Sequence, residues 1–77
     1  MKVFSPPGGA PIRLTPREME VLVLLTRGLQ NKHIAHTLGI AEGTVKVHLT
    51  HIANKTGLRS RTQLALFAVA LRDREES

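Results

Sequence analysis

Cysteine is absent from this chain of 77 residues, and features that mark several protein classes are missing with it. Without cysteine there is no disulfide framework and no thiolate metal site, so packed side chains must hold the fold. No stretch approaches the roughly 18 apolar residues that a membrane span needs, and the amino-terminal segment lacks the apolar core of a signal peptide. We therefore expect a cytoplasmic protein with no membrane partner.

Acidic residues are nearly missing from the middle of the chain. The formal net charge is +5, and Glu42 is the only acid between Val21 and Arg72. The basic residues inside the same stretch are Arg27, Lys32, Lys46, Lys55, Arg59 and Arg61. The middle of the chain therefore forms a cationic surface.

Residues for catalysis are also scarce. The chain has no cysteine nucleophile, no carboxylate pair inside a predicted helix core and no glycine-rich phosphate loop. Ser60 and Thr15 stand at helix-cap positions, where their hydroxyls serve the backbone and do not act as nucleophiles. A helical core of this size has little room for a substrate pocket. We expect neither an enzyme nor a cofactor.

Two capping boxes predict where the first and the fourth helix begin. Thr15-Pro16-Arg17-Glu18 combines a threonine cap, a proline at the first helical position and a glutamate that reaches back. Its helix runs to Arg27 and ends at Gly28. Ser60-Arg61-Thr62-Gln63 is the second capping box.

The fourth helix carries eight consecutive apolar residues, Leu64 to Leu71. One stripe of them closes the core, namely Leu64, Phe67, Ala68 and Leu71. A second apolar face is left over, made of Leu66, Val69 and Ala70. We expect a symmetric dimer through this face, unless a domain upstream in a longer protein covers it.

Between these helices, two short amphipathic patterns joined by a glycine-centred turn predict a helix-turn-helix. Asn31 is the expected cap of the second helix, and Gly39 makes the turn. The third helix runs from about Glu42 to Thr56. The residues expected to face inward are Ile34, Ala35 and Leu38, then Val45, His48, Leu49, Ile52 and Thr56. The predicted fold class is all-α, a four-helix bundle with a central helix-turn-helix and a fourth, dimerising helix.

The outward side of the third helix is polar and basic, which a packed core does not require and a DNA major groove does. The predicted base-contacting residues are Lys46, Val47, Thr50 and Asn54. The predicted contacts to the DNA backbone are Asn31, Lys32, Thr44, His51 and Lys55. Helix starts near Asn31 and Glu42 favour phosphates through their backbone amides. Double-stranded DNA is the partner that these residues indicate.

Three segments in this order resemble the LuxR-type (GerE-type) helix-turn-helix family: LTPREMEVL from Leu14, NKHIAHTLGIAEGTVKVHL from Asn31 and TGLRSRTQLAL from Thr56. The resemblance implies the DNA-binding output domain of a bacterial transcription regulator, often the carboxy-terminal part of a response regulator. It also implies a homodimer on inverted repeats, an N-terminal sensor or receiver domain and RNA polymerase as a partner. The family's contact positions fall on the residues that the helix geometry selects.

The chain divides into a flexible leader or linker at residues 1–13, the helix-turn-helix domain at 14–71 and a charged tail at 72–77. The leader holds three of the four prolines and a pair of glycines. This composition is typical of a linker to a preceding domain, and equally of the boundary of a cloned fragment.

Four histidines form two pairs, His33 with His36 and His48 with His51, whose spacing can chelate zinc. No metal site is predicted, because His48 is expected at the core edge and the first pair on a solvated side.

Two other protein classes share features of this chain. The fourth region of a sigma factor has a similar helix-turn-helix but would need further promoter-binding regions. A protein-interaction module would use the apolar fourth helix and would not need the outward residues of the third.

Overall fold

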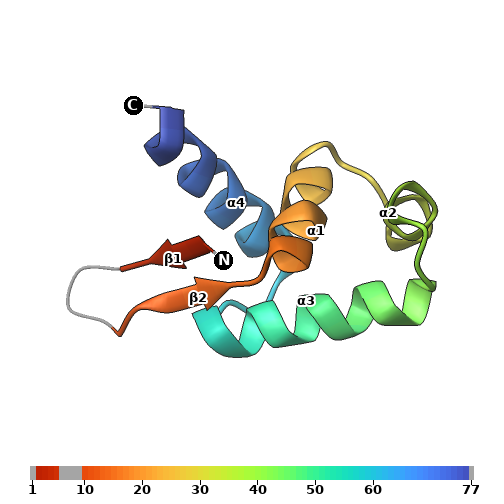
Figure 1. Cartoon of the computed structure of the whole chain (residues 1–77), viewed down its shortest axis with the longest axis horizontal. Coiled ribbons are helices and arrows are strands. Elements are labelled where there is room, and N and C mark those ends of the chain that lie inside the picture. Colours follow the sequence, from red (N-terminus) through yellow and green to blue (C-terminus); the bar gives the residue numbers. More distant parts are fainter. Residues whose placement is uncertain (1, 6–9, 77) are drawn as a thin grey trace.

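Two short strands and four helices follow one another in the computed structural model, which describes residues 2–5 and 10–76. The elements are β1 (Lys2–Phe4), β2 (Ile12–Leu14), α1 (Pro16–Thr26), α2 (Asn31–Leu38), α3 (Glu42–Thr56) and α4 (Arg61–Glu76). In Figure 1, α3 runs along one side of the molecule with α1 above its middle, α2 near its start, and the strands and α4 toward its end. The predicted all-α, four-helix class is confirmed.

Both predicted capping boxes form. The Thr15 hydroxyl accepts from the Glu18 amide at 3.1 Å, and the Thr15 amide donates to Glu18 Oε1 at 2.9 Å. At the start of α4, Ser60 Oγ accepts from the Gln63 amide at 3.0 Å, while the Ser60 amide donates to Gln63 Oε1 at 3.3 Å. These reciprocal bonds satisfy backbone donors that a helix start leaves without partners.

The start of α2 differs from the prediction by one residue. Gln30 is the N-cap, with no hydrogen bond from its side chain, and Asn31 is the first helical residue. The Asn31 side chain is engaged elsewhere, because its Oδ1 accepts from Arg61 Nη1 at 2.7 Å. That bond joins residues 30 positions apart, so the local pattern could not reveal it. The turn that ends α2 is as predicted, with Gly39 at a left-handed φ of 68°.

The leader predicted to be flexible contains strand structure at residues 2–4 and 12–14. β1 and β2 pair antiparallel, with Phe4 opposite Ile12. The Phe4 ring meets Phe67 of α4 edge-on, with ring centroids 5.5 Å apart, and Leu14 is fully buried. The prediction was wrong for these two segments because strands of three residues are too short to show a periodic pattern. Residues 1 and 6–9 of the predicted leader lie outside the described part of the chain.

The charged tail predicted from residue 72 onward is helical as far as Glu76, since α4 continues through it. Arginine and glutamate are good helix formers, and nothing in this stretch breaks the helix begun at Arg61. Residue 77 lies outside the described part. In the described part, no helix is both long and apolar enough to cross a membrane.

A single hydrophobic core joins all four helices and β2. Its buried members are Leu14, Val21, Leu22, Leu24, Leu25, Ile34, Ala35, Val45, Ile52, Leu64, Ala68 and Leu71. Val45 and Ile52 of α3 are both 0% exposed, and His48, Leu49 and Thr56 on the same side are half-buried. The predicted inward side of α3 is therefore confirmed.

Replacing Ile52 with alanine should lower the free energy of unfolding by about 2–5 kcal/mol, because it opens a cavity beneath α3. Val47→Ala is the matched control on the same helix, since Val47 is 51% exposed and its truncation removes little buried surface. Urea unfolding followed by circular dichroism measures both. Equal effects of the two substitutions would contradict this packing of α3.

Candidate nucleic-acid interface

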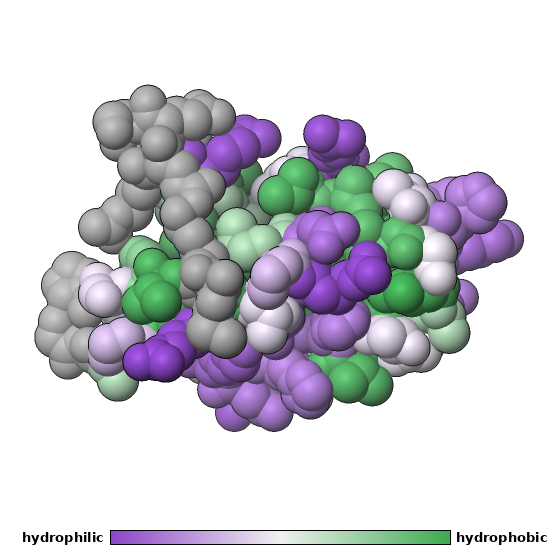
Figure 2. Space-filling model, viewed as in Figure 1, coloured by the Kyte–Doolittle hydropathy of each residue, from purple (hydrophilic) through white to green (hydrophobic). Residues whose placement is uncertain are grey.

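The outward side of α3 is a continuous exposed face, here called the reading face. It consists of Gly43, Lys46, Val47, Thr50, His51 and Asn54, all of them exposed. Their spacing of three and four residues places them on one side of the helix, opposite Val45 and Ile52. Figure 2 shows hydrophilic residues gathered along the margin where α3 runs. The residues that the sequence selected for base contact thus share one surface.

Val47 is an apolar residue within this polar face, and 51% of it is exposed. It stands beside Lys46, which is exposed as well. A lysine that donates to guanine and a valine that packs on a thymine methyl group are complementary ways to read base edges in a major groove. The pair can therefore distinguish base pairs by both polarity and shape.

Thr50 has an internal partner that the sequence did not indicate. Its hydroxyl donates to the Lys46 carbonyl at 2.9 Å, one helical turn earlier. The hydroxyl proton is thus engaged within α3, while the oxygen keeps the capacity to accept a hydrogen bond and the methyl group can make apolar contacts. Thr50 is suited to accept from a base amino group or to touch a thymine methyl.

The residues predicted to contact the DNA backbone fall into two groups. Lys32, Thr44 and His51 are exposed, so their side chains are accessible to phosphates. Asn31 is partly buried and accepts from Arg61, and Lys55 is held by groups of the protein itself. The contacts of all five with DNA remain predictions.

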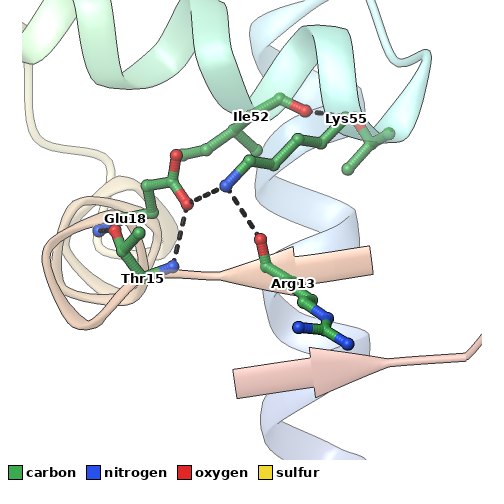
Figure 3. Close-up of polar contacts among 6 residues, drawn as sticks. Arg13, Thr15, Glu18, Ile52 and Lys55 are labelled. Carbon is green, nitrogen blue, oxygen red and sulfur yellow. Dashed lines mark hydrogen bonds and ion pairs between the residues drawn. The ribbon is translucent and has the colours of Figure 1, made fainter. Parts of the chain in front are cut away.

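Lys55 ties the end of α3 to α1 and β2. Its Nζ donates to Glu18 Oε1 at 2.6 Å and to the carbonyl oxygen of Arg13 at 2.8 Å. Figure 3 shows the ammonium between these two acceptors, with the Thr15 amide bound to the same carboxylate oxygen. Two of the three ammonium donors are thereby engaged, which leaves Lys55 with less to offer a phosphate than Lys32 has.

Glu18 is a buried carboxylate, with only 2% of the residue exposed. Burial alone raises the pKa of its carboxyl group, but the hydrogen bonds from Lys55 and Thr15 and the charge of Lys55 outweigh burial and lower that pKa below the ordinary value of 4.5. Glu18 is therefore ionised at neutral pH. Its charge is compensated by Lys55, as a buried carboxylate requires.

Arg61 is a second residue whose role the sequence did not reveal. Its guanidinium donates from Nη1 to Asn31 Oδ1 at 2.7 Å and from Nη2 to the Leu29 carbonyl at 2.6 Å. The sequence placed Arg61 only inside a capping box and in the cationic stretch. A contact over 30 residues has no local signal, so only the folded arrangement shows it.

The second apolar face of α4 is only partly open to solvent. Leu66 is 65% exposed and Ala70 is exposed, while Val69 is half-buried. Leu66 and Val69 also line a shallow hollow of about 290 Å³ between α1 and α4, together with Leu25 and Ala65. An exposed leucine next to an apolar hollow is a surface that can pack against another molecule.

The histidine pairs are distributed as the sequence indicated. His33 and His36 are exposed on α2, His51 is exposed on the reading face, and His48 is half-buried on the inner side of α3. Within the described ranges, no group of three or more histidine, cysteine, aspartate or glutamate side chains is placed to hold a metal ion.

Two helices joined at Gly39, the second with an accessible polar face and a packed inner side, define a helix-turn-helix domain. The family model for bacterial regulatory proteins of the luxR family matches residues 13–68. The chain belongs to this family, and the resemblance noted from its motifs is confirmed.

Several curated relatives are similar to this chain. The transcriptional regulatory protein LnrK of Bacillus subtilis is 54% identical over 56 residues, which is 73% of this chain and 26% of LnrK. The nitrate/nitrite response regulator protein NarL of Escherichia coli is 49% identical over 55 residues, 71% of this chain and 26% of NarL. The oxygen regulatory protein NreC of Staphylococcus aureus is 43% identical over 56 residues, 73% of this chain and 26% of NreC. The matched part of the chain spans about a quarter of the length of these relatives.

Glu18→Gln should lower the free energy of unfolding at pH 7 by about 1–3 kcal/mol, because the substitution removes the charge that Lys55 pairs with. Since the pKa of Glu18 is lowered in the folded state, its contribution is present above pH 4.5 and is lost as the pH falls through the folded-state value. The difference between the wild type and the variant should therefore shrink below pH 4.5.

Glu20→Gln is the control for this measurement. Glu20 lies on the same helix but forms only an exposed pair with Arg17 at 3.6 Å, so its substitution should change stability little at any pH. Chemical denaturation from pH 3 to pH 7, a range chosen to bracket ordinary carboxyl titration, follows both variants. A Glu18→Gln deficit that stays constant through the acid range would show that the charge of Glu18 does not stabilise the fold.

Proposed function

We propose that this chain is the DNA-binding output domain of a bacterial transcription regulator, with α3 in the major groove of a specific duplex. The observation that carries the proposal is the reading face. It is exposed and mostly polar, it carries the cation Lys46, and it lies opposite the buried side of the same helix. Nothing in the packing of the domain requires Lys46, Val47 and Asn54 there, whereas base edges in a groove would contact all three.

Accessible hydrogen-bond donors on α2 and α3 support the same function. Phosphate contacts would come from Lys32, Thr44 and His51, which are accessible, and from the amides at the starts of α2 and α3. Asn31 and Lys55 are secondary contacts in this proposal, because each already binds a group of the domain. Such contacts position the protein on the duplex, and Lys46, Val47 and Thr50 supply most of the specificity.

We further propose that two copies bind an inverted repeat through α4. Support comes from Leu66, which is 65% exposed, and from the neighbouring Val69 and Ala70. An isologous contact between identical helices would bury the apolar surface of both copies. The two reading faces would then meet half-sites about one helical turn apart on one side of the duplex.

The rest of the regulator is inferred from the relatives. The matched region covers 26% of LnrK and of NarL, and NarL is a response regulator by name. We therefore propose that the domain works in the cytoplasm, joined to an N-terminal sensor or receiver domain, and that RNA polymerase is its partner at promoters. No catalytic step and no cofactor belong to this function.

Selection of bound sequences from a random pool of DNA duplexes should recover a specific site with inverted half-sites. The chain as given is the bait, and sequencing after repeated rounds reports the site, its symmetry and its spacing together. Enrichment of single half-sites would overturn the dimer proposal alone. A pool that stays random at low salt would mean that the domain does not read DNA, and would favour the interaction module that uses α4.

Lys46→Ala should weaken binding to the selected site by about 1–3 kcal/mol and relax the preference at one base pair of each half-site. Arg72→Ala is the control, because Arg72 is an exposed cation of α4 and is not part of the reading face. Fluorescence anisotropy with specific and scrambled duplexes measures both variants. Equal losses on the two duplexes would show that Lys46 acts only through its charge.

A further inference from the structure

Arg61, the first residue of α4, forms a bridge to the start of α2. Two different nitrogens of its guanidinium are used, one for the Asn31 side chain at 2.7 Å and one for the Leu29 carbonyl at 2.6 Å. The planar guanidinium fork holds both acceptors in a fixed relative orientation. The last residues of the α1–α2 connection and the first turn of α2 are thereby attached to α4.

The start of α2 has few other attachments. Its N-cap, Gln30, makes no side-chain hydrogen bond, and the preceding turn contains Gly28 at a φ of 76°. The buried residues of α2, Ile34 and Ala35, lie one turn further along the helix. Without Arg61, the first turn of α2 would be held by backbone hydrogen bonds to Gln30 and by the partly buried Leu29.

We propose that Arg61 is a positioning residue, which sets the start of α2 relative to α4 and so aligns the two elements that meet DNA and the second copy. The inference rests on the proposed DNA-binding function. Asn31 and Lys32 at the start of α2 face the phosphates in that function, and α4 joins the two copies. A small rotation of α2 about its packed end would move its amides away from the phosphate while the core stays intact.

Two other roles for Arg61 make different predictions. If the guanidinium contacted a phosphate directly, a lysine at position 61 would retain much of the binding. Removal of the charge would then reduce the slope of the logarithm of the binding constant against the logarithm of the salt concentration by about one. If Arg61 only stabilised the fold, its variants would bind normally at temperatures well below their melting transition. A positioning role depends on the fork, which lysine lacks.

The test compares Arg61→Lys, Arg61→Gln and Arg59→Gln on the duplex recovered for the wild type. Arg59 is the matched control, an exposed arginine in the α3–α4 connection. In the cold and at several salt concentrations, both Arg61 variants should bind about tenfold more weakly, the loss expected for a pair of charge-assisted hydrogen bonds. Arg59→Gln should stay within about twofold, a difference well under 1 kcal/mol.

Hydrogen exchange distinguishes a local change at the start of α2 from a change in overall stability. In Arg61→Lys the amides of His33 and Ile34, which donate to the Gln30 carbonyl, should exchange faster, while Ile52 in the core keeps its protection. Wild-type affinity in Arg61→Lys, a lower salt slope in Arg61→Gln, or a uniform loss of protection would each overturn the proposal. Failure of the wild type to bind any selected duplex would instead refute the DNA-binding function itself.

Discussion

Burial of one side of α3 is the constraint on which the rest of the structure depends. Val45 and Ile52 are completely enclosed, and they lie two helical turns apart on the same side. With these positions committed to the core, α3 cannot rotate about its axis, and the opposite side must face outward. One helix therefore serves as a central packing element and as the exposed surface of the domain, and neither role can change without the other.

Hydrogen bonds from two cations, Lys55 and Arg61, hold parts of the helices that the core does not. α3 packs against α1, α2 and β2. Its last turn is also held by Lys55, which donates to a carboxylate on α1 and to a carbonyl on β2. Arg61 does the same for the start of α2. Both cations bind groups from distant parts of the chain, so part of the positive charge of the sequence serves architecture and is not free for an anionic partner.

Local signals made most of the fold predictable. The Thr15 and Ser60 capping boxes, the left-handed Gly39 and the periodic inner side of α3 all act within one or two helical turns, and each is present in the structure. Partners that lie 37 and 30 residues apart, Lys55 with Glu18 and Arg61 with Asn31, leave no such pattern. Paired strands of three residues were missed for the related reason that each is stabilised by the other strand, and β1 also by the contact of Phe4 with Phe67, not by a pattern in its own sequence.

The carbonyl of Arg13 has a mechanical consequence. It belongs to β2 and accepts from Lys55 in the final turn of α3, so the backbone ahead of α1 is attached directly to the helix with the exposed polar face. A force applied to the chain ahead of Ile12 would reach that helix along two routes, through the Lys55 ammonium and through Leu14 in the hydrophobic core. Tension at the amino-terminal side would thus act on the last turn of α3 and on the core beneath it together, which couples the backbone ahead of α1 to the helix with the exposed polar face.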